Sequence, residues 1–221
     1  MNLFQMISSL KQRGLLIAVE GCDRGGKTTQ CKLLQEHIRT LGQPCEYIKF
    51  PDRTTPIGQL INNYLSNVTD GSATLNDQAV HLLFSANRWE LAGHIQELLN
   101  SGTSIILDRY VHSGAAYTAA KGLDLNWCRL PDTGLPAPDL VIFIDVPSEE
   151  STSRDGYGEE RYERAAFQKL VREMFEQLRD QSWLMINGVG AIEQVTERIK
   201  NGLFKEKSLK DLAAEPLRLI N

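Results

Sequence analysis

The chain has 221 residues, a net charge of −4 at pH 7 and a pI of about 5.6. Hydrophobic residues make up 42% and charged residues 24%, which is the balance of an ordinary soluble globular protein. A negative net charge argues against a nucleic-acid-binding surface, which normally needs an excess of basic residues. It still allows one small phosphorylated substrate, because a local cluster of arginines can act inside an acidic protein.

Cysteines and apolar runs give no sign of secretion or membrane insertion. The four cysteines form no C-x-x-C pair and no zinc-like cluster with histidine, so we expect free thiols in a reducing compartment. The longest apolar runs, Leu15–Val19 and Leu140–Ile144, are five residues each and too short to span a bilayer. The sequence therefore predicts a cytoplasmic protein that binds no membrane, with the nucleus and the mitochondrion as open alternatives.

In chain order, short β-rich runs alternate with helical patterns. The expected strands are Leu15–Glu20, Cys45–Phe50, Thr103–Leu107, Leu140–Asp145 and Trp183–Ile186. The expected helices are Lys27 to about Leu41, Ile57–Ser66, Leu75–Asn100, Ser113–Lys121, Arg161–Asp180 and one from Ala191 onward. Strands joined by crossover helices indicate an α/β fold with a parallel sheet and helices on both faces. Without a visible repeat or linker, residues 1–221 are expected to form one domain, with 1–12 as a loose or helical leader.

A phosphate-binding loop follows the first expected strand. The match to G-x-x-x-x-G-K-[ST] consists of Gly21, Cys22, Asp23, Arg24, Gly25, Gly26, Lys27 and Thr28, with Thr29 next. Glycines let consecutive N–H groups point at an anion, and the following helix adds the positive end of its dipole. We therefore expect the loop to bind ATP, with Lys27 on the β and γ phosphates and the Thr28 hydroxyl on Mg²⁺.

Three variable positions of the loop carry separate expectations. Arg24 can fold its guanidinium over the transferring phosphoryl group, although a solvated surface arginine is the alternative. Asp23 would repel polyphosphate, so it is expected to face a sugar hydroxyl instead. Cys22 is a small residue that the loop tolerates, and the helix N-terminus with nearby cations could lower its pKa.

A second anion site is indicated by arginines outside the loop. The phosphate loop indicates which nucleotide cofactor is bound but not which reaction is catalysed. GTPases read guanine with an N-K-x-D element, and this chain contains no Asn-Lys pair. Arg53 and Arg109 each follow an expected strand, and Arg88 lies on the long helix. Arginine offers planar, bidentate donors that suit phosphate.

Two further positions have a structural alternative. Phe84 and Arg88 are four residues apart on one helix, so a stacking ring and a hydrogen-bonding guanidinium could act together on a base. Alternatively, Phe84 belongs to the core and Arg88 is a surface ion-pair partner. Asp108 ends the third expected strand, the position of a carboxylate that orients Mg²⁺, but it could instead cap the next helix.

These segments together resemble thymidylate kinases of the eukaryotic and poxvirus type, from about Arg13 to about Ile199. The resemblance is carried by the Asp-Arg loop, Phe50-Pro51-Asp52-Arg53, Leu82–Glu90, Asp108-Arg109-Tyr110 with Ser113-Gly114, Gly134-Leu135-Pro136 with Pro138-Asp139-Leu140, and Glu160-Arg161-Tyr162-Glu163. It implies a three-layer P-loop NTPase fold with a five-stranded parallel sheet, a short lid at about 148–163, a homodimer, and Mg²⁺-dependent transfer from ATP to dTMP. The leader and the tail, about 201–221, fall outside the match and have no assigned role.

The resemblance also implies roles for individual residues. Asp23 accepts the deoxyribose 3′-hydroxyl, and Lys27, Arg24, Asp108 and Arg109 serve catalysis. Arg53 and Arg109 hold the monophosphate, Phe84 stacks on thymine and Arg88 hydrogen-bonds its carbonyl edge. Tyr162 excludes a ribose 2′-hydroxyl, whereas Phe50, Ser113, Tyr117 and Thr118 line the acceptor region. On the donor side, Arg154 packs on adenine, and Asn187 and Gly188 begin the loop beneath it.

Two alternatives to a dTMP kinase stay open on the sequence alone. One is a kinase for another pyrimidine nucleotide such as dUMP or UMP, against which the set of Phe84, Arg88 and Tyr162 counts. The other is a nucleotide-binding switch with little turnover, which the second group of arginines disfavours.

Overall fold

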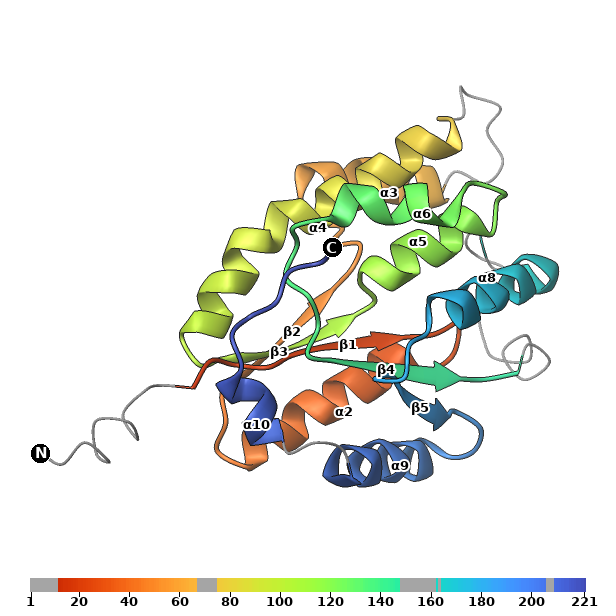
Figure 1. Ribbon diagram of the computed structural model, residues 1–221. Helices are drawn as coiled ribbons and strands as arrows, with labels where there is room; N and C mark the ends of the chain where they lie inside the picture. Colours follow the sequence, from red (N-terminus) through yellow and green to blue (C-terminus); the bar gives the residue numbers. More distant parts are fainter. Residues whose placement is uncertain (1–11, 67–74, 148–161, 163, 206–208) are drawn as a thin grey trace, which may run out of the picture.

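The computed structural model describes residues 12–66, 75–147, 162, 164–205 and 209–221 (Figure 1). Nearly all of the expected leader and lid, including Arg154, lies outside these ranges. None of the described helices is both long and apolar enough to cross a bilayer.

Five parallel strands form one sheet, as the sequence predicted, and their order, which it did not predict, is β2-β3-β1-β4-β5. The strands are β1 (Leu16–Glu20), β2 (Cys45–Lys49), β3 (Ser104–Asp108), β4 (Leu140–Asp145) and β5 (Leu184–Asn187). The register aligns Val19 with Asp108 and Asp108 with Lys49. The carboxyl ends of β1, β2 and β3 therefore meet at one edge, where parallel sheets bind their ligands.

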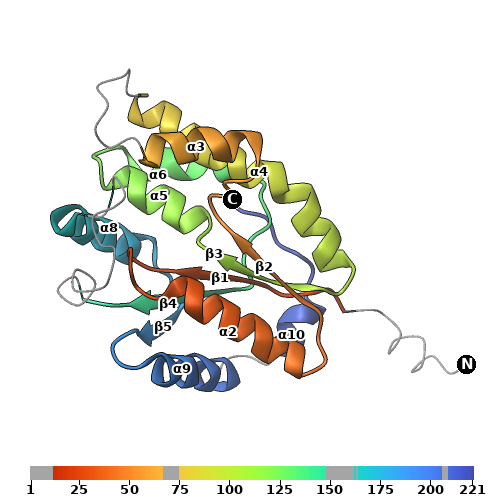
Figure 2. The same cartoon turned by 180° about the vertical axis from the view of Figure 1, so that it is seen from behind.

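Helices cover both faces of this sheet (Figures 1 and 2). They are α2 (Lys27–Thr40), α3 (Pro56–Ser66), α4 (Asp77–Asn100), α5 (Val111–Ala119), α6 (Leu125–Arg129), the 3-10 helix η1 (Leu130–Asp132), α8 (Ala165–Leu178), α9 (Ile192–Lys205) and α10 (Leu209–Ala214). Along β1, Leu16 and Ala18 join the core with α4, α5 and α8, whereas Ile17 and Val19 join the core with α2 and α9. This alternation produces the predicted three layers.

Local capping explains where several helices differ from the predicted bounds. Helix α4 begins at Asp77 because the Asn76 side chain accepts a hydrogen bond from the backbone N–H of Ala79 at 2.7 Å. Helix α8 begins at Ala165 and not at Arg161, since Arg164 has extended backbone angles. Helix α6 and η1 were not predicted; the Asp124 carboxylate caps α6 by accepting from the backbone N–H of Trp127 at 2.8 Å.

The C-terminal segment, which the sequence left without a role, packs against the domain. The N–H of Ile220 donates to the carbonyl of Leu135 at 2.8 Å, and Gly134 donates back to Ile220 at 2.9 Å. Leu217 and Ile220 pack against the core that includes α4 and α8. The tail is therefore an antiparallel neighbour of the segment that follows η1.

Candidate active site

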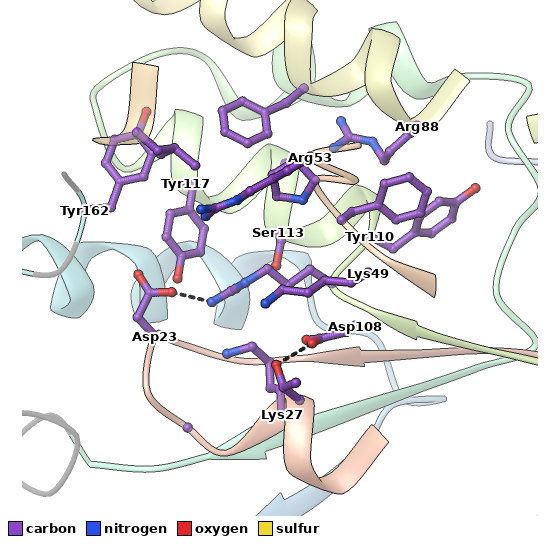
Figure 3. Close-up of a pocket in the computed structure, with 18 of the residues that line it drawn as sticks. Asp23, Lys27, Lys49, Arg53, Arg88, Asp108, Tyr110, Ser113, Tyr117 and Tyr162 are labelled. Atoms are coloured by element: carbon purple, nitrogen blue, oxygen red, sulfur yellow. Dashed lines mark hydrogen bonds and ion pairs between the residues drawn. The ribbon is translucent and has the colours of Figure 1, made fainter. Parts of the chain in front are cut away.

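A cavity of about 500 Å³ lies beyond the carboxyl ends of β1, β2 and β3 (Figure 3). The predicted site residues that line it are Asp23, Arg24, Gly25, Gly26, Lys27, Thr28, Thr29, Phe50, Arg53, Phe84, Arg88, Asp108, Arg109, Ser113, Tyr117 and Tyr162. Thr118 and two lysines that the sequence did not single out, Lys49 and Lys121, also line it. The phosphate loop and the second group of arginines thus share one enclosure.

The phosphate loop is held tightly against the sheet. Gly21 has a φ of +145°, and a Cβ at this position would lie 2.6 Å from the carbonyl oxygen of Ile144, so only glycine fits. Lys27 is 5% exposed, and its Nζ donates to the carbonyl of Cys22 at 2.5 Å. Burial, reinforced by the charge of Arg109, lowers the pKa of Lys27 to about 8.

Cys22 lies in an environment that does not favour the reactive thiolate form. The prediction that neighbouring cations could lower its pKa is wrong, because burial raises that pKa to about 11 in spite of Lys27 and Arg109. Its thiol contacts the backbone carbonyl of Gln168 at 3.8 Å. Cys22 is therefore a buried, small residue of the loop.

Two arginines that line the cavity have left-handed backbone angles, which residues other than glycine seldom adopt. Arg24 has a φ of 57° and Arg109 a φ of 69°. Such conformations cluster at functional sites, where the surrounding fold compensates for their cost. The backbone is therefore strained at the two positions from which a guanidinium lines the cavity beside the phosphate loop.

Thr28 and Asp108 offer an oxygen site that suits Mg²⁺. The Thr28 hydroxyl donates to the Asp108 carboxylate at 2.5 Å, and the Tyr47 hydroxyl donates to the same carboxylate at 3.0 Å. Asp108 does not cap the next helix, which answers the structural alternative. Among the described residues no group of three or more His, Cys, Asp or Glu could hold a metal. A hydroxyl and one carboxylate nevertheless fit Mg²⁺, which completes its shell with water and phosphate oxygens.

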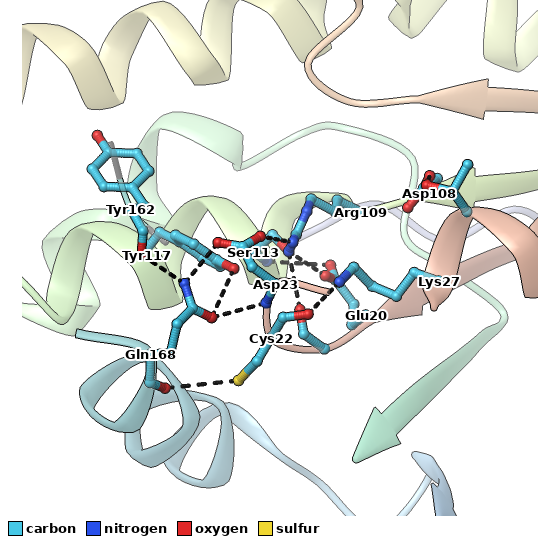
Figure 4. Close-up of polar contacts among 12 residues, drawn as sticks. Glu20, Cys22, Asp23, Lys27, Asp108, Arg109, Ser113, Tyr117, Tyr162 and Gln168 are labelled. Atoms are coloured by element: carbon cyan, nitrogen blue, oxygen red, sulfur yellow. Dashed lines mark hydrogen bonds and ion pairs between the residues drawn. The ribbon is translucent and has the colours of Figure 1, made fainter. Parts of the chain in front are cut away.

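Asp23 is the centre of a polar network that joins the loop to α5 and α8 (Figure 4). Its carboxylate pairs with Arg109 and accepts from Nε2 of Gln168 at 2.6 Å. In return, Oε1 of Gln168 accepts from the backbone N–H of Asp23 at 2.8 Å. Gln168, which the sequence did not single out, therefore fixes the carboxylate in the loop.

Glu20, also missed from the sequence, organises the start of α5. Its side chain is fully buried and accepts from the backbone N–H groups of Tyr110 at 3.0 Å and Ser113 at 3.2 Å. The Ser113 hydroxyl donates to Glu20 at 2.5 Å and accepts from Nη1 of Arg109 at 3.1 Å. The last residue of β1 thus positions the arginine that follows β3.

Arg88 combines features of both of its predicted alternatives. It lines the cavity, yet it is 2% exposed and forms a bidentate ion pair with Asp132, with Nε to Oδ1 at 3.0 Å and Nη2 to Oδ2 at 2.7 Å. Phe84 also lines the cavity and is half-buried. Their spacing on α4 therefore does bring a ring and a guanidinium to the same enclosure, and the ion pair lies in the interior rather than on the surface.

The other residues predicted for the acceptor side also line the cavity. Tyr162 accepts a hydrogen bond from Lys121 at 2.7 Å, and its own hydroxyl donates to that of Tyr64 at 3.2 Å. The Tyr117 ring lies 6.0 Å from the Tyr162 ring and carries the Arg109 guanidinium over its face at 5.1 Å. Arg53 donates to the Asn62 side chain at 3.0 Å.

The residues expected beneath adenine are at the end of β5 and outside this cavity. The carbonyl of Asn187 accepts from Nη1 of Arg198 at 2.8 Å, and the side chain of Asn187 accepts from the backbone N–H of Val189 at 2.9 Å. At Gly188, a Cβ would lie 2.5 Å from the Val146 side chain. The loop is thus packed closely onto β4.

A cavity with a phosphate loop at one end and separate arginines beyond it suits transfer between two phosphorylated molecules, the chemistry of P-loop nucleoside-monophosphate kinases. The thymidylate kinase family model matches residues 19–199. A thymidylate kinase of Arabidopsis thaliana is 49% identical over 87% of this chain and 72% of its own length. That of Homo sapiens is 41% identical over 93% and 96%. The solved structure of the Candida albicans enzyme covers 95% of this chain and 99% of its own, with 41% identity and a TM-score of 0.84.

The chain belongs to the thymidylate kinase family. It is accordingly an enzyme, a kinase whose phosphoryl acceptor is dTMP, and the alternative of a kinase for another pyrimidine nucleotide is not favoured.

Proposed function

We propose that the protein transfers the γ-phosphoryl group of ATP to dTMP, giving ADP and dTDP, inside the cavity described above. The observation that carries this proposal is the single enclosure shared by the phosphate loop and by Arg53, Arg88 and Arg109. Phosphoryl transfer needs mainly positioning and charge neutralisation, with little covalent participation by the protein. Both requirements can be assigned to residues that line this cavity.

Lys27 and Arg24 act on the transferring group. The Lys27 ammonium neutralises the β and γ phosphates, and Arg24 reaches over the loop toward the charge that develops on the γ-phosphoryl oxygens. Thr28 and Asp108 would hold Mg²⁺, which supplies further neutralisation of the phosphate oxygens when bound. Arg154 and the loop at Asn187 and Gly188 are proposed to hold the adenine.

Arg53 and Arg109 hold the acceptor phosphate in line with the donor. Asp23 is engaged by Arg109 and Gln168, but a carboxylate has about four lone-pair positions, so it can still accept a sugar hydroxyl. Tyr162, whose hydroxyl accepts a hydrogen bond from Lys121, is assigned the role of excluding a ribose 2′-hydroxyl.

Phe84 stacks on the thymine ring, and Arg88 donates to a carbonyl oxygen on its edge. Phe50, Ser113 and Tyr117 complete the lining on the acceptor side, where all three border the cavity. A ring for stacking and a charged donor for the base edge are a combination that suits a carbonyl-bearing pyrimidine.

The protein is further proposed to be a cytoplasmic homodimer. Leu60 on α3 and Leu82 on α4 are 55% and 49% exposed. Since α3 and α4 lie side by side in both views (Figures 1 and 2), these side chains supply apolar surface for a second copy.

A coupled assay of ADP release tests the proposed reaction. We expect turnover with Mg·ATP to depend on dTMP, and dTMP to exceed dUMP and UMP in kcat/KM. If ADP release were the same with and without dTMP, a low rate would support the nucleotide-binding switch and a high rate would support a hydrolase. Higher kcat/KM for UMP than for dTMP would contradict the assignment of Tyr162.

A further inference from the structure

Arg88 reaches the acceptor cavity with its side chain already fixed on two sides. Its Nε and Nη2 donate to the two oxygens of Asp132, and both residues are 2% exposed. A Cβ on Gly114 would lie 2.6 Å from Nη2, 2.8 Å from Nη1 and 2.9 Å from Cζ, so the guanidinium lies directly on the α5 backbone. Figure 3 shows Arg88 at the edge of the cavity. Its Nη1 is the terminal nitrogen that Asp132 does not engage.

Asp132 is itself anchored from several directions. The Ser85 hydroxyl lies 2.8 Å from Oδ1 of Asp132 and 3.0 Å from the carbonyl of Pro131. Trp89 donates through Nε1 to the same Pro131 carbonyl at 2.9 Å. Three positions of α4, Ser85, Arg88 and Trp89, thus bind the η1 turn that carries the carboxylate.

We propose that Asp132 is a positioning residue for base recognition, which holds the Arg88 guanidinium so that Nη1 meets a carbonyl acceptor on the pyrimidine. This rests on the proposed role of Arg88 as the residue that reads the base. A guanidinium has donors and no acceptor, so in a fixed orientation it favours a keto group and is mismatched with an exocyclic amino group. The pair therefore selects a 4-keto pyrimidine nucleotide over a 4-amino one.

A purely structural ion pair would have a different consequence. Removing one partner of a buried pair leaves an uncompensated charge and lowers stability wherever the pair lies. Selectivity between two acceptors changes only if the geometry of the donor at the base changes, because selectivity is a difference between two transition-state affinities. Comparison of dTMP with dCMP separates these two roles.

The chain provides a matched control in a second buried arginine–aspartate pair. Arg13 donates to both oxygens of Asp139 at 2.7 Å, with the Asp139 side chain 3% exposed. Neither residue lines the acceptor cavity. Asp139→Asn therefore weakens an arginine–aspartate pair outside the cavity, together with the bond that Oδ2 of Asp139 accepts from the backbone N–H of Leu16 at 2.9 Å. It reports the cost of such a loss at a site away from the acceptor.

Steady-state kinetics with dTMP, dCMP and ATP on purified full-length variants test the inference. For Asp132→Asn we expect the ratio of kcat/KM for dTMP to that for dCMP to fall about tenfold or more, with a raised KM for dTMP and an unchanged KM for ATP. Asp139→Asn should lower the melting temperature and leave the ratio as in the wild type. An unchanged ratio for a folded Asp132→Asn protein would overturn the inference.

Three further variants complete the design. Arg88→Ala should lower the dTMP to dCMP ratio by at least as much as Asp132→Asn, and adding Asp132→Ala to it should lower the ratio no further. If Arg88→Ala leaves the ratio unchanged, the proposed role of Arg88 fails; if only Asp132→Asn leaves it unchanged, the positioning role fails. Should Asp132→Asn not fold, Ser85→Ala tests the same point, because it removes the hydroxyl that contacts Oδ1 of Asp132 and so loosens the carboxylate that holds Arg88. An unchanged ratio in that variant would count against the inference.

Discussion

Arg24 is the residue whose loss is expected to separate an effect on kcat most clearly from an effect on KM. It lies in the phosphate loop with a left-handed backbone and lines the cavity, where we propose that charge develops during transfer. We expect Arg24→Ala to lower kcat by about 10²–10⁴-fold and to change KM for ATP and dTMP little, because a cation that acts on the transition state contributes little to ground-state binding. Steady-state kinetics with each substrate varied in turn give this result directly.

Arg53→Ala is the control for that experiment. Arg53 lines the same cavity and is proposed to hold the acceptor phosphate, so its loss should raise KM for dTMP and leave KM for ATP nearly unchanged. An Arg24→Ala enzyme with only a raised KM, or an Arg53→Ala enzyme impaired for ATP and not for dTMP, would mean that the donor and acceptor sides are exchanged.

Lys27 should make ATP use depend on pH above neutrality. Burial and Arg109 hold the pKa of Lys27 at about 8, below its ordinary 10.5, so the free enzyme loses the ammonium as pH rises through about 8. The charged form binds phosphate, and therefore kcat/KM for ATP should fall about tenfold per pH unit above that pKa. Bound polyphosphate favours the ammonium, so kcat at saturating ATP should persist to higher pH.

Stability provides the control for the pH profile. Between about pH 8 and 10.5 the unfolded chain binds a proton at Lys27 that the folded chain does not, so this group makes the free energy of unfolding rise with pH. Titration of Lys27 is therefore not expected to unfold the protein at high pH and so cause the fall in kcat/KM. Thermal melts at each pH check that the protein stays folded. A kcat/KM for ATP that stays constant to pH 9.5 would contradict a Lys27 pKa near 8.

At the residue scale, the sequence could predict side chains that line the cavity, but not the side chains that hold those residues in position. Lys27, Thr28 and Asp108 follow from a motif and from a strand end. Gln168 lies three and seven residues before the buried Val171 and Phe175, so a polar residue on an apolar helical stripe was its available signal. Asp132 had no such signal, because its partner is 44 positions away in a turn that periodicity does not reveal.

Elements with a strong periodic pattern were predictable to within a few residues, and short ones were not. Strand β4 was predicted with its observed ends, because an apolar run bounded by turns specifies a buried strand. Helix α6 and η1 are five and three residues long, too short for a helical period to emerge. The C-terminal segment adopts its place through pairing with residues about 80 positions earlier, which local sequence does not encode.

The docked C-terminal segment should contribute to stability through one of two adjacent apolar side chains. Ile220 packs against the core and its backbone bonds Leu135, whereas Leu219 is 50% exposed. We expect Ile220→Ala to lower the free energy of unfolding by about 1–2 kcal/mol, less than a fully buried isoleucine would. Urea denaturation followed by fluorescence measures this.

Leu219→Ala is the matched control, since it removes a similar side chain from the same segment. Its effect should stay within about 0.5 kcal/mol, as is usual for exposed positions. Equal losses for the two variants would show that the segment contacts the domain in another way. Loss of stability in neither would mean that it detaches readily in solution.

On the scale of the whole molecule, one site is assembled from segments spread over most of the chain. Residues from the ends of three strands, from α4 and α5, and from the region before α8 line one cavity, and α8 adds Gln168 behind Asp23. The parallel sheet makes this possible, because it brings strand ends from distant positions to a common edge. The three-layer fold was predictable because its strands alternate with helical periods along the chain. Which site residues contact one another was not predictable, because those contacts form only when the strand ends meet at that edge.

The exposed apolar surface of α3 and α4 leads to a prediction about assembly. If Leu82 lies in the contact between two copies, Leu82→Glu places a charge in a desolvated interface and should shift the protein from dimer to monomer in sedimentation velocity. Leu41→Glu is the control, since Leu41 is 62% exposed at the end of α2 on the other face of the sheet and should leave the dimer intact. Identical sedimentation of wild type and Leu82→Glu would exclude this surface of α4 from the interface, whereas dissociation by Leu41→Glu would place the contact on the α2 side.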